Sequence, residues 1–64
     1  MKQIINQIVS KNTRKVFIVK WDSKEQTSWL EISGADIMVG KNTKTVEEAI
    51  DTAQIFIDSQ PDLY

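Results

Sequence analysis

The chain of 64 residues lacks two of the side chains that carry much of protein chemistry, because it contains no histidine and no cysteine. Without histidine, neither a serine–histidine–aspartate triad nor a cysteine–histidine pair can form within the chain, and the commonest metal ligand is missing. Without cysteine there is no thiol nucleophile, no thiolate zinc site and no disulfide. We therefore expect a protein that is not an enzyme and that uses no metal or cofactor.

The remaining polar groups with suggestive spacing are a trio of carboxylates and one glycine–lysine segment. Glu47 and Asp51 are four residues apart, so they are neighbours on a helix, with Glu48 beside them. A calcium loop needs alternating oxygen ligands and a glycine at fixed spacing, which these residues lack. Residues 40–43 read Gly-Lys-Asn-Thr, but a phosphate-binding loop needs a second glycine five residues earlier and a hydroxyl residue directly after the lysine. We expect a solvated acidic surface and a turn.

The two tryptophans, Trp21 and Trp29, are more informative, because exposed tryptophan is enriched in the hot spots of protein interfaces. Trp29 falls on the same face of an extended segment as Glu31, which favours a position outside the main core. A core tryptophan covered by the N-terminal segment is the alternative.

Length and composition indicate one small globular domain spanning residues 1–64. Hydrophobic residues make up 41% of the chain and charged residues 27%, as in an ordinary soluble domain. No apolar run approaches the roughly 20 residues that a membrane span requires. A domain of this size buries only about 60% of the surface that its unfolded chain exposes, so the core will be thin. We expect an intracellular protein without membrane association.

Charge is distributed unevenly along the chain. All eight basic residues lie in residues 1–44, whereas residues 45–64 carry five acidic residues and no basic one. A nucleic-acid-binding domain usually presents a dominant basic face, so direct binding to nucleic acid is not expected. The acidic segment is either a solvated helix surface or a surface that a protein partner reads.

The elements that must position these residues are mostly strands, because the chain has nine isoleucines and five valines but only two leucines. Residues 16–21 and 27–32 are predicted strands, joined by a short polar hairpin at residues 22–26. The first ten residues have apolar side chains at helical spacing, but their β-branched chemistry favours a strand. Residues 36–39 are either a short strand or a helical turn.

Residues 45–59 are the clearest helix. Thr45 and Glu48 fit a capping box, in which Thr45 is the N-cap and Glu48 reaches back to its amide. Pro61 is expected to stop the helix. Apolar residues recur at steps of three and four and form one stripe, which consists of Val46, Ala49, Ile50, Ala53, Phe56 and Ile57.

The strand at residues 16–21 is apolar on both of its faces. Phe17, Val19 and Trp21 share one face, whereas Val16 and Ile18 lie on the other. One helix can cover only one face of an open sheet. Either the sheet curls into a small barrel and fills its own interior, or an apolar face remains for a partner. Both outcomes suit a binding module better than a catalyst.

The order of these segments resembles the chromodomain and chromo shadow domain family. A hydrophobic first strand, V-F-I-V-K-W at residues 16–21, S-W-L-E at residues 28–31 and a final helix follow that family's pattern. Trp21 matches the tryptophan of its K-W step, and Trp29 matches that of its T-W-E step. The resemblance implies an α+β fold with a curved three-stranded antiparallel sheet, of small-barrel character, packed against one C-terminal helix at about residues 45–59.

The resemblance also implies two modes of binding. Chromodomains bind methyl-lysine in a cage of three aromatic residues, of which Trp21 supplies one wall here, while the other two positions fall on Gln3 and Lys24. Chromo shadow domains lack the cage, dimerise through the C-terminal helix and capture an extended peptide. The residues expected to bind a peptide or partner are Trp21, Trp29, Ile5, Gln7 and Val9, and those expected on the dimer or partner helix are Ala49, Ile50, Ala53, Phe56 and Ile57.

Two hypotheses of different class remain. The first is a non-enzymatic protein–protein interaction module that binds an extended peptide or chromatin-associated partner at the sheet edge, with homodimerisation through its helix as a further option and a nuclear location. The second is a free-standing small regulator of the phage-inhibitor type, which binds a host protein through its acidic helix and is cytoplasmic.

Overall fold

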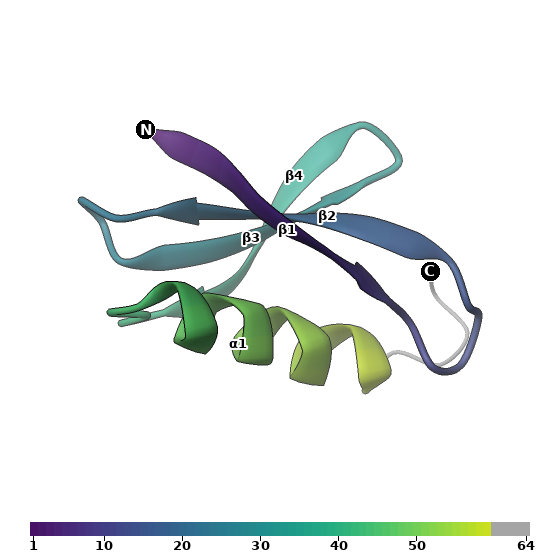
Figure 1. Cartoon of the computed structure of the whole chain (residues 1–64). Helices are drawn as coiled ribbons and strands as arrows, with labels where there is room; N and C mark the ends of the chain where they lie inside the picture. Colours follow the sequence, from purple (N-terminus) through teal and green to yellow (C-terminus); the bar gives the residue numbers. More distant parts are fainter. Residues whose placement is uncertain (60–64) are drawn as a thin grey trace.

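The structure is a computed structural model that describes residues 1–59, and it consists of one antiparallel sheet followed by one helix (Figure 1). The strands are consecutive neighbours in the four-stranded sheet, in the order β1-β2-β3-β4. The elements are β1 (Lys2–Val9), β2 (Val16–Asp22), β3 (Thr27–Ile32), β4 (Ala35–Lys41) and α1 (Val46–Asp58).

The predicted α+β class, with an antiparallel sheet and one C-terminal helix, is confirmed, but the prediction of three strands is wrong. The fourth strand contains residues 36–39, which the sequence left between strand and helical turn. Ser33 (φ 52°) and Gly34 (φ 83°) both have left-handed backbone conformations, and Ile32 pairs with Ala35 on either side of them. Two consecutive residues with positive φ form the tight hairpin turn that suits the twist of two strands. The chain therefore turns straight back into β4 after β3.

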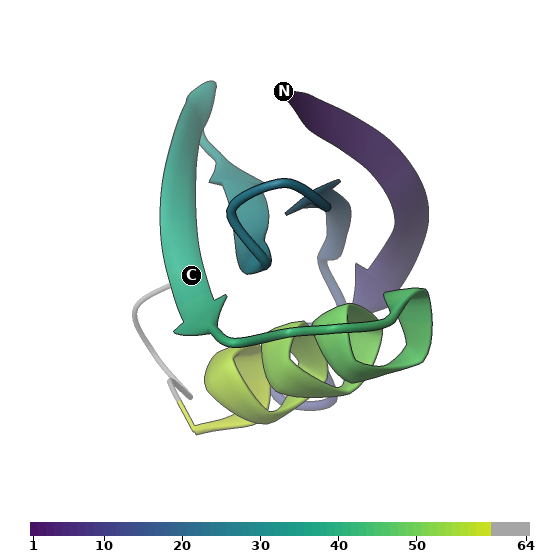
Figure 2. The ribbon, with the colours of Figure 1, turned by 90° about the vertical axis from the view of Figure 1, so that its left-hand side faces the viewer.

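The expected small-barrel character is also wrong, because the sheet is not closed. Among residues 1–59, β1 pairs only with β2 and β4 pairs only with β3, so both are edge strands. In Figure 2 these two edge strands stand on either side of the central pair, with α1 crossing below. The sheet is strongly curved but keeps two free edges.

The first ten residues form a strand, as their β-branched chemistry predicted. The register with β2 shifts between Ile4 and Asn6, which marks a β-bulge. A bulge places an extra residue on one strand and bends it. Here Ile5 is half-buried and packs against the core, whereas its neighbour Ile4 is exposed.

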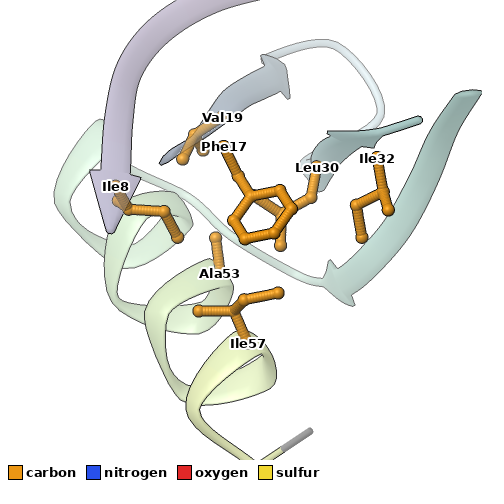
Figure 3. Close-up of a cluster of buried hydrophobic side chains, with 7 residues drawn as sticks. All are labelled: Ile8, Phe17, Val19, Leu30, Ile32, Ala53 and Ile57. Carbon is orange, nitrogen blue, oxygen red and sulfur yellow. The ribbon is translucent and has the colours of Figure 1, made fainter. Parts of the chain in front are cut away.

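The core lies between α1 and one face of the sheet. Ala49 and Ala53 are fully buried, and their small side chains let the helix approach the strands closely. Gly40 in β4 serves the same approach, because a Cβ at this position would collide with Cγ2 of Thr52 on the helix. The cluster shown in Figure 3 comprises Ile8, Phe17, Val19, Leu30, Ile32, Ala53 and Ile57.

The helix boundaries agree with the prediction. Thr45 is the N-cap, and its Oγ1 accepts a hydrogen bond of 3.1 Å from the Glu48 amide. The Glu48 carboxylate reaches back one residue further than a capping box requires, because it accepts from the Lys44 amide at 3.1 Å. At the other end Nδ2 of Asn12 donates to the Asp58 carbonyl at 3.0 Å, which satisfies a terminal helix carbonyl. Pro61 lies outside the described residues.

Candidate functional site

The face of the sheet opposite α1 is the most distinctive surface of the molecule. α1 packs on one face, and among residues 1–59 no other segment covers the opposite one (Figures 1 and 2). We call this opposite face the outer face. Cross-strand pairing brings its residues into rows across the four strands. It is formed by Lys2, Ile4, Ile18, Lys20, Trp29, Glu31, Asp36 and Met38.

Apolar side chains occupy much of the outer face. Ile4 is 67% exposed and Met38 is 42% exposed, at opposite edges of the sheet. Ile18 and Trp29 are half-buried between them. The sequence left two outcomes open, a closed small barrel or an apolar face that the helix does not cover, and the open sheet excludes the first. Charged side chains interrupt these apolar groups, because Lys20 lies between Ile4 and Trp29 in the cross-strand row. Exposed apolar side chains beside charged ones are found at many interaction sites.

An ion-pair network runs through the same face. The Lys20 ammonium donates to Oε1 of Glu31 at 3.0 Å and to Oδ1 of Asp36 at 2.9 Å. The hydrogen bonds to Asp36 and Glu31 raise the pKa of Lys20 above its ordinary value. Hydrogen bonds from Lys20 and then Lys2 lower the pKa of Asp36. The network links β2, β3 and β4 through Lys20.

Trp29 lies at the centre of the outer face, away from the helix-covered core. Its indole Nε1 donates to Oγ1 of Thr27 at 2.9 Å, which fixes the plane of the ring. The Lys2 ammonium lies over that ring, 4.1 Å from its centroid, and also 3.1 Å from Oδ2 of Asp36. The position outside the main core is as predicted, and the N-terminal strand contributes this one charged side chain above it.

Trp21 lies on the other side of the sheet and serves the fold. Its neighbours in register are Gln3 and Ser28, and its indole Nε1 donates to the Thr43 carbonyl at 3.0 Å. Thr43 in turn donates through Oγ1 to the Gln26 carbonyl at 3.0 Å. Trp21 thus anchors the segment between β4 and α1. The two tryptophans face opposite sides, so they do not form a single site.

The three β1 residues expected to bind a partner also lie on different faces of the sheet. Ile5 packs toward the core, whereas Gln7 and Val9 are exposed on the outer side. The Gln7 amide donates to Oδ1 of Asn6 at 2.9 Å, and the Val9 carbonyl accepts from Nε2 of Gln54 at 3.1 Å. Side chains of the same molecule therefore occupy part of this strand's free hydrogen-bonding groups.

The apolar stripe of α1 faces the sheet except at Val46, which was predicted in the stripe but is 40% exposed. Ala49, Ala53 and Ile57 are buried, and Ile50 and Phe56 are half-buried against the core. In this fold the stripe is not open to a second helix, so the expected dimer surface is core. The exposed side of α1 is instead formed by Val46, Glu47, Glu48, Asp51 and Ile55.

Ile55 is a surface residue that sequence reasoning missed. It is 71% exposed and lies four residues after Asp51 on the solvent side of the helix. The signal was present in the sequence, because Ile55 falls outside the three- and four-residue steps that define the buried stripe.

The other tested motifs do not assemble into sites within residues 1–59. Gly40 and Lys41 belong to β4, not to a loop between a strand and a helix. In this part of the chain the structure contains no pocket and no cluster of three side chains that could hold a metal ion. No helix of residues 1–59 has the length and apolar character needed to cross a bilayer.

Comparisons with protein-family models, with curated proteins and with solved structures found no significant match to the chain.

Proposed function

We propose that the protein is a non-enzymatic protein–protein interaction module whose outer face, with the adjoining edge of β1, binds an extended segment of a partner. The observation that carries the proposal is the face around Trp29, which α1 leaves uncovered and on which Ile4 and Met38 are exposed, while α1 fills the other face of the sheet. The absence of histidine and cysteine from the sequence favours the same class.

The physical basis is the combination of an apolar surface and an adjacent edge strand. A peptide that adds to a sheet edge gains main-chain hydrogen bonds, while alternate side chains enter neighbouring pockets and provide specificity. Ile4, Gln7 and Val9 lie along this edge strand. The Gln7 backbone amide and the Val9 carbonyl already bond to Asn6 and Gln54, so a partner would have to displace these two bonds or pair with the rest of the strand. A partner segment aligned along β1 would place alternate apolar side chains over the outer face.

The resemblance to the chromo family supports this proposal at two tryptophans and in the order of elements. It supports peptide capture more than methyl-lysine recognition, because Gln3, the register neighbour of Trp21, is not aromatic and neither is Lys24. It gives no support to helix-mediated dimerisation here, since Ala49 and Ala53 are buried. A nuclear location and a chromatin-associated partner belong to this same proposal.

A peptide selection with residue-level mapping tests the proposal. Peptides are selected from a random dodecamer library on the immobilised domain, and one of them is titrated into ¹⁵N-labelled protein. We expect shifts of amides around Ile4, Ile18 and Met38 and of the Trp29 indole signal, with the Trp21 indole signal as the internal reference. Shifts confined to α1, or no peptide enriched over an unrelated control domain, would contradict the proposal.

A second candidate function is supported by the exposed side of α1. Ile55 projects to solvent next to Asp51, and Glu47 lies one further turn away on the same side. An apolar residue surrounded by carboxylates suits a basic protein surface with a small apolar pocket. This is the surface that a small regulator acting through its acidic helix would use.

Charge reversal on α1 distinguishes this second candidate function from binding at the outer face. If α1 is the binding surface, Glu47→Lys with Asp51→Lys should abolish binding to the partner, and binding should weaken as salt is raised. Unchanged affinity under both treatments would dispose of this candidate and leave the outer face.

A further inference from the structure

We propose that the outer face contains a receptor site for a lysine ammonium group of the partner, and that Lys2 occupies this site as an intramolecular competitor. The site is formed by the face of Trp29 and by Oδ2 of Asp36. The inference deepens the proposed function and rests on it only for the existence of a partner.

The contact of Lys2 crosses the sheet. β1 is separated from β4 by two strands, yet the Lys2 ammonium reaches Asp36 at the start of β4. The same nitrogen lies over Trp29 of β3. A cation in this position is attracted by the aromatic face through a cation–π interaction and by the carboxylate through a charge-assisted hydrogen bond. Neither interaction depends on which strand carries the cation. Any flexible chain bearing a primary ammonium and able to reach this point would meet the same two groups.

The receiving groups are held in place without Lys2. The Trp29 ring is fixed by its hydrogen bond to Thr27, as described above. Asp36 is fixed through its other oxygen, because Oδ1 accepts from Lys20 at 2.9 Å. The Asp36 carboxylate therefore keeps one anchored oxygen when Lys2 leaves, with Oδ2 free to accept from another ammonium. A binding site whose groups are already oriented loses less conformational entropy when a ligand arrives.

The charge balance of the site favours a cation. Without Lys2, the cluster contains two carboxylates, Glu31 and Asp36, and a single ammonium, Lys20. One negative charge is then uncompensated. Asp36 offers an oxygen as a hydrogen-bond acceptor, which suits an ammonium with three N–H donors better than a fully methylated one.

The segment that holds Lys2 is weakly anchored. Met1 and Ile4 on either side of it are exposed, so little apolar burial fixes this end of β1. The bulge between Ile4 and Asn6 separates it from the half of the strand that packs on the core. The Met1 amine makes an exposed ion pair with Asp22 at 3.2 Å, and exposed pairs contribute little. The Lys2 side chain is therefore in a position to exchange with a ligand.

Because Lys2 occupies the site in most molecules, an external ammonium binds only the molecules in which the site is open. Its apparent affinity is the intrinsic affinity multiplied by the fraction of open molecules. Lys2→Met keeps the apolar stem of the side chain and removes the competing charge. Binding of n-butylammonium, which carries a lysine-like chain, should then become about 10-fold tighter than in the wild-type protein, if the site is open about one tenth of the time.

The test is a titration of n-butylammonium chloride into ¹⁵N-labelled wild-type and Lys2→Met protein at constant ionic strength, followed on the Trp29 indole signal. We expect saturable shifts in the variant, weaker ones in the wild type, and none with n-butanol. Lys24→Met removes a lysine in the β2–β3 hairpin and should leave the wild-type titration unchanged. Adding Asp36→Asn to Lys2→Met should remove the gain. The Trp21 indole signal, which depends on the hydrogen bond to Thr43, reports that each variant is folded.

Equal titrations of the wild type and Lys2→Met, or an equal gain in Lys24→Met, would overturn the inference. If Lys2→Met did not fold, the Lys2 side-chain signals of the wild-type protein would be followed instead. We expect n-butylammonium to shift them, and unchanged signals would overturn the inference. A selected peptide that binds the outer face while n-butylammonium does not would remove this inference and leave the proposed function. A site that binds n-butylammonium while no peptide is selected would support this inference and contradict the proposed function.

Discussion

The two faces of one sheet differ in what completes them. On the covered face, Val19 and Leu30 are fully buried and belong to one hydrophobic cluster with Ala53 of α1 (Figure 3). On the outer face, cross-strand rows place Trp29 between Lys20 and Met38, and charged groups tie the strands together. The same strands therefore provide a core on one side and, by our proposal, a recognition surface on the other.

The two faces should therefore tolerate substitutions differently. The size of a side chain on the covered face is constrained, because a smaller residue would leave a cavity that the surrounding core fills only in part. A side chain on the outer face meets solvent and is free to serve a partner. Substitutions on the covered face should change the free energy of unfolding, and substitutions on the outer face should change binding.

The largest effect is expected from Leu30→Ala on the covered face. Leu30 is fully buried at the centre of the sheet, and its truncation should lower the free energy of unfolding by about 2–5 kcal/mol. Ile4→Ala on the outer face is the matched control and should change it by less than about 0.5 kcal/mol. Urea unfolding followed by circular dichroism measures both. Equal losses in the two variants would contradict the contrast between the faces.

The next effect concerns the close approach of α1 to β4. Gly40→Ala places a Cβ against Thr52, and such overpacking should cost about 1–3 kcal/mol. The Cγ2 methyl of Thr52 is the atom in the way, so Thr52→Ser in the same chain should recover much of the loss. Thermal unfolding of the single and double variants checks this. A double variant no more stable than Gly40→Ala would show that the contact is not the cause.

A smaller effect is expected from the ion pairs of the outer face. The pKa of Asp36 is lowered in the folded state, so its contribution to stability is present above its unfolded pKa of about 4 and is lost as the pH falls through the folded value. Wild-type protein should exceed Asp36→Asn in urea midpoint at pH 7, and the difference should shrink as the pH falls toward 2. Because the pairs are only partly buried, salt still screens them, and the difference should also fall in 1 M salt. A difference independent of pH would contradict the role given to Asp36.

The sequence predicted the covered face well, because its chemistry is local. Capping at Thr45, the stripe through Ala53 and the alternation through Val19 each follow from spacing alone. Residues 36–39 stayed open between a strand and a helical turn, and the fold was predicted with three strands, because Ser33 gives little sign that it will adopt a positive φ and Gly34 alone is typical of a break.

The apolar residues of this face were predicted, but the contact of Lys2 with Asp36 over the Trp29 ring was not predicted. Lys2 and Asp36 are far apart in the sequence and on strands that do not pair, so only the curvature of the whole sheet brings them together over Trp29. The opposite orientations of Trp21 and Trp29 did follow from alternation, yet grouping them as one binding site ignored it. Ile55 was not predicted as a surface residue, although it lies outside the apolar stripe and is 71% exposed.

The most direct test of the central claim is the affinity of the library-selected peptide for two matched variants, measured by one fluorescence titration of labelled peptide. Ile4→Ser with Met38→Ser removes the exposed apolar groups of the outer face, and Val46→Ser with Ile55→Ser removes those of α1. We expect the first variant to bind about 10-fold or more weaker and the second to bind like the wild type. Loss of binding in the α1 variant, with the outer-face variant unchanged, would contradict the account.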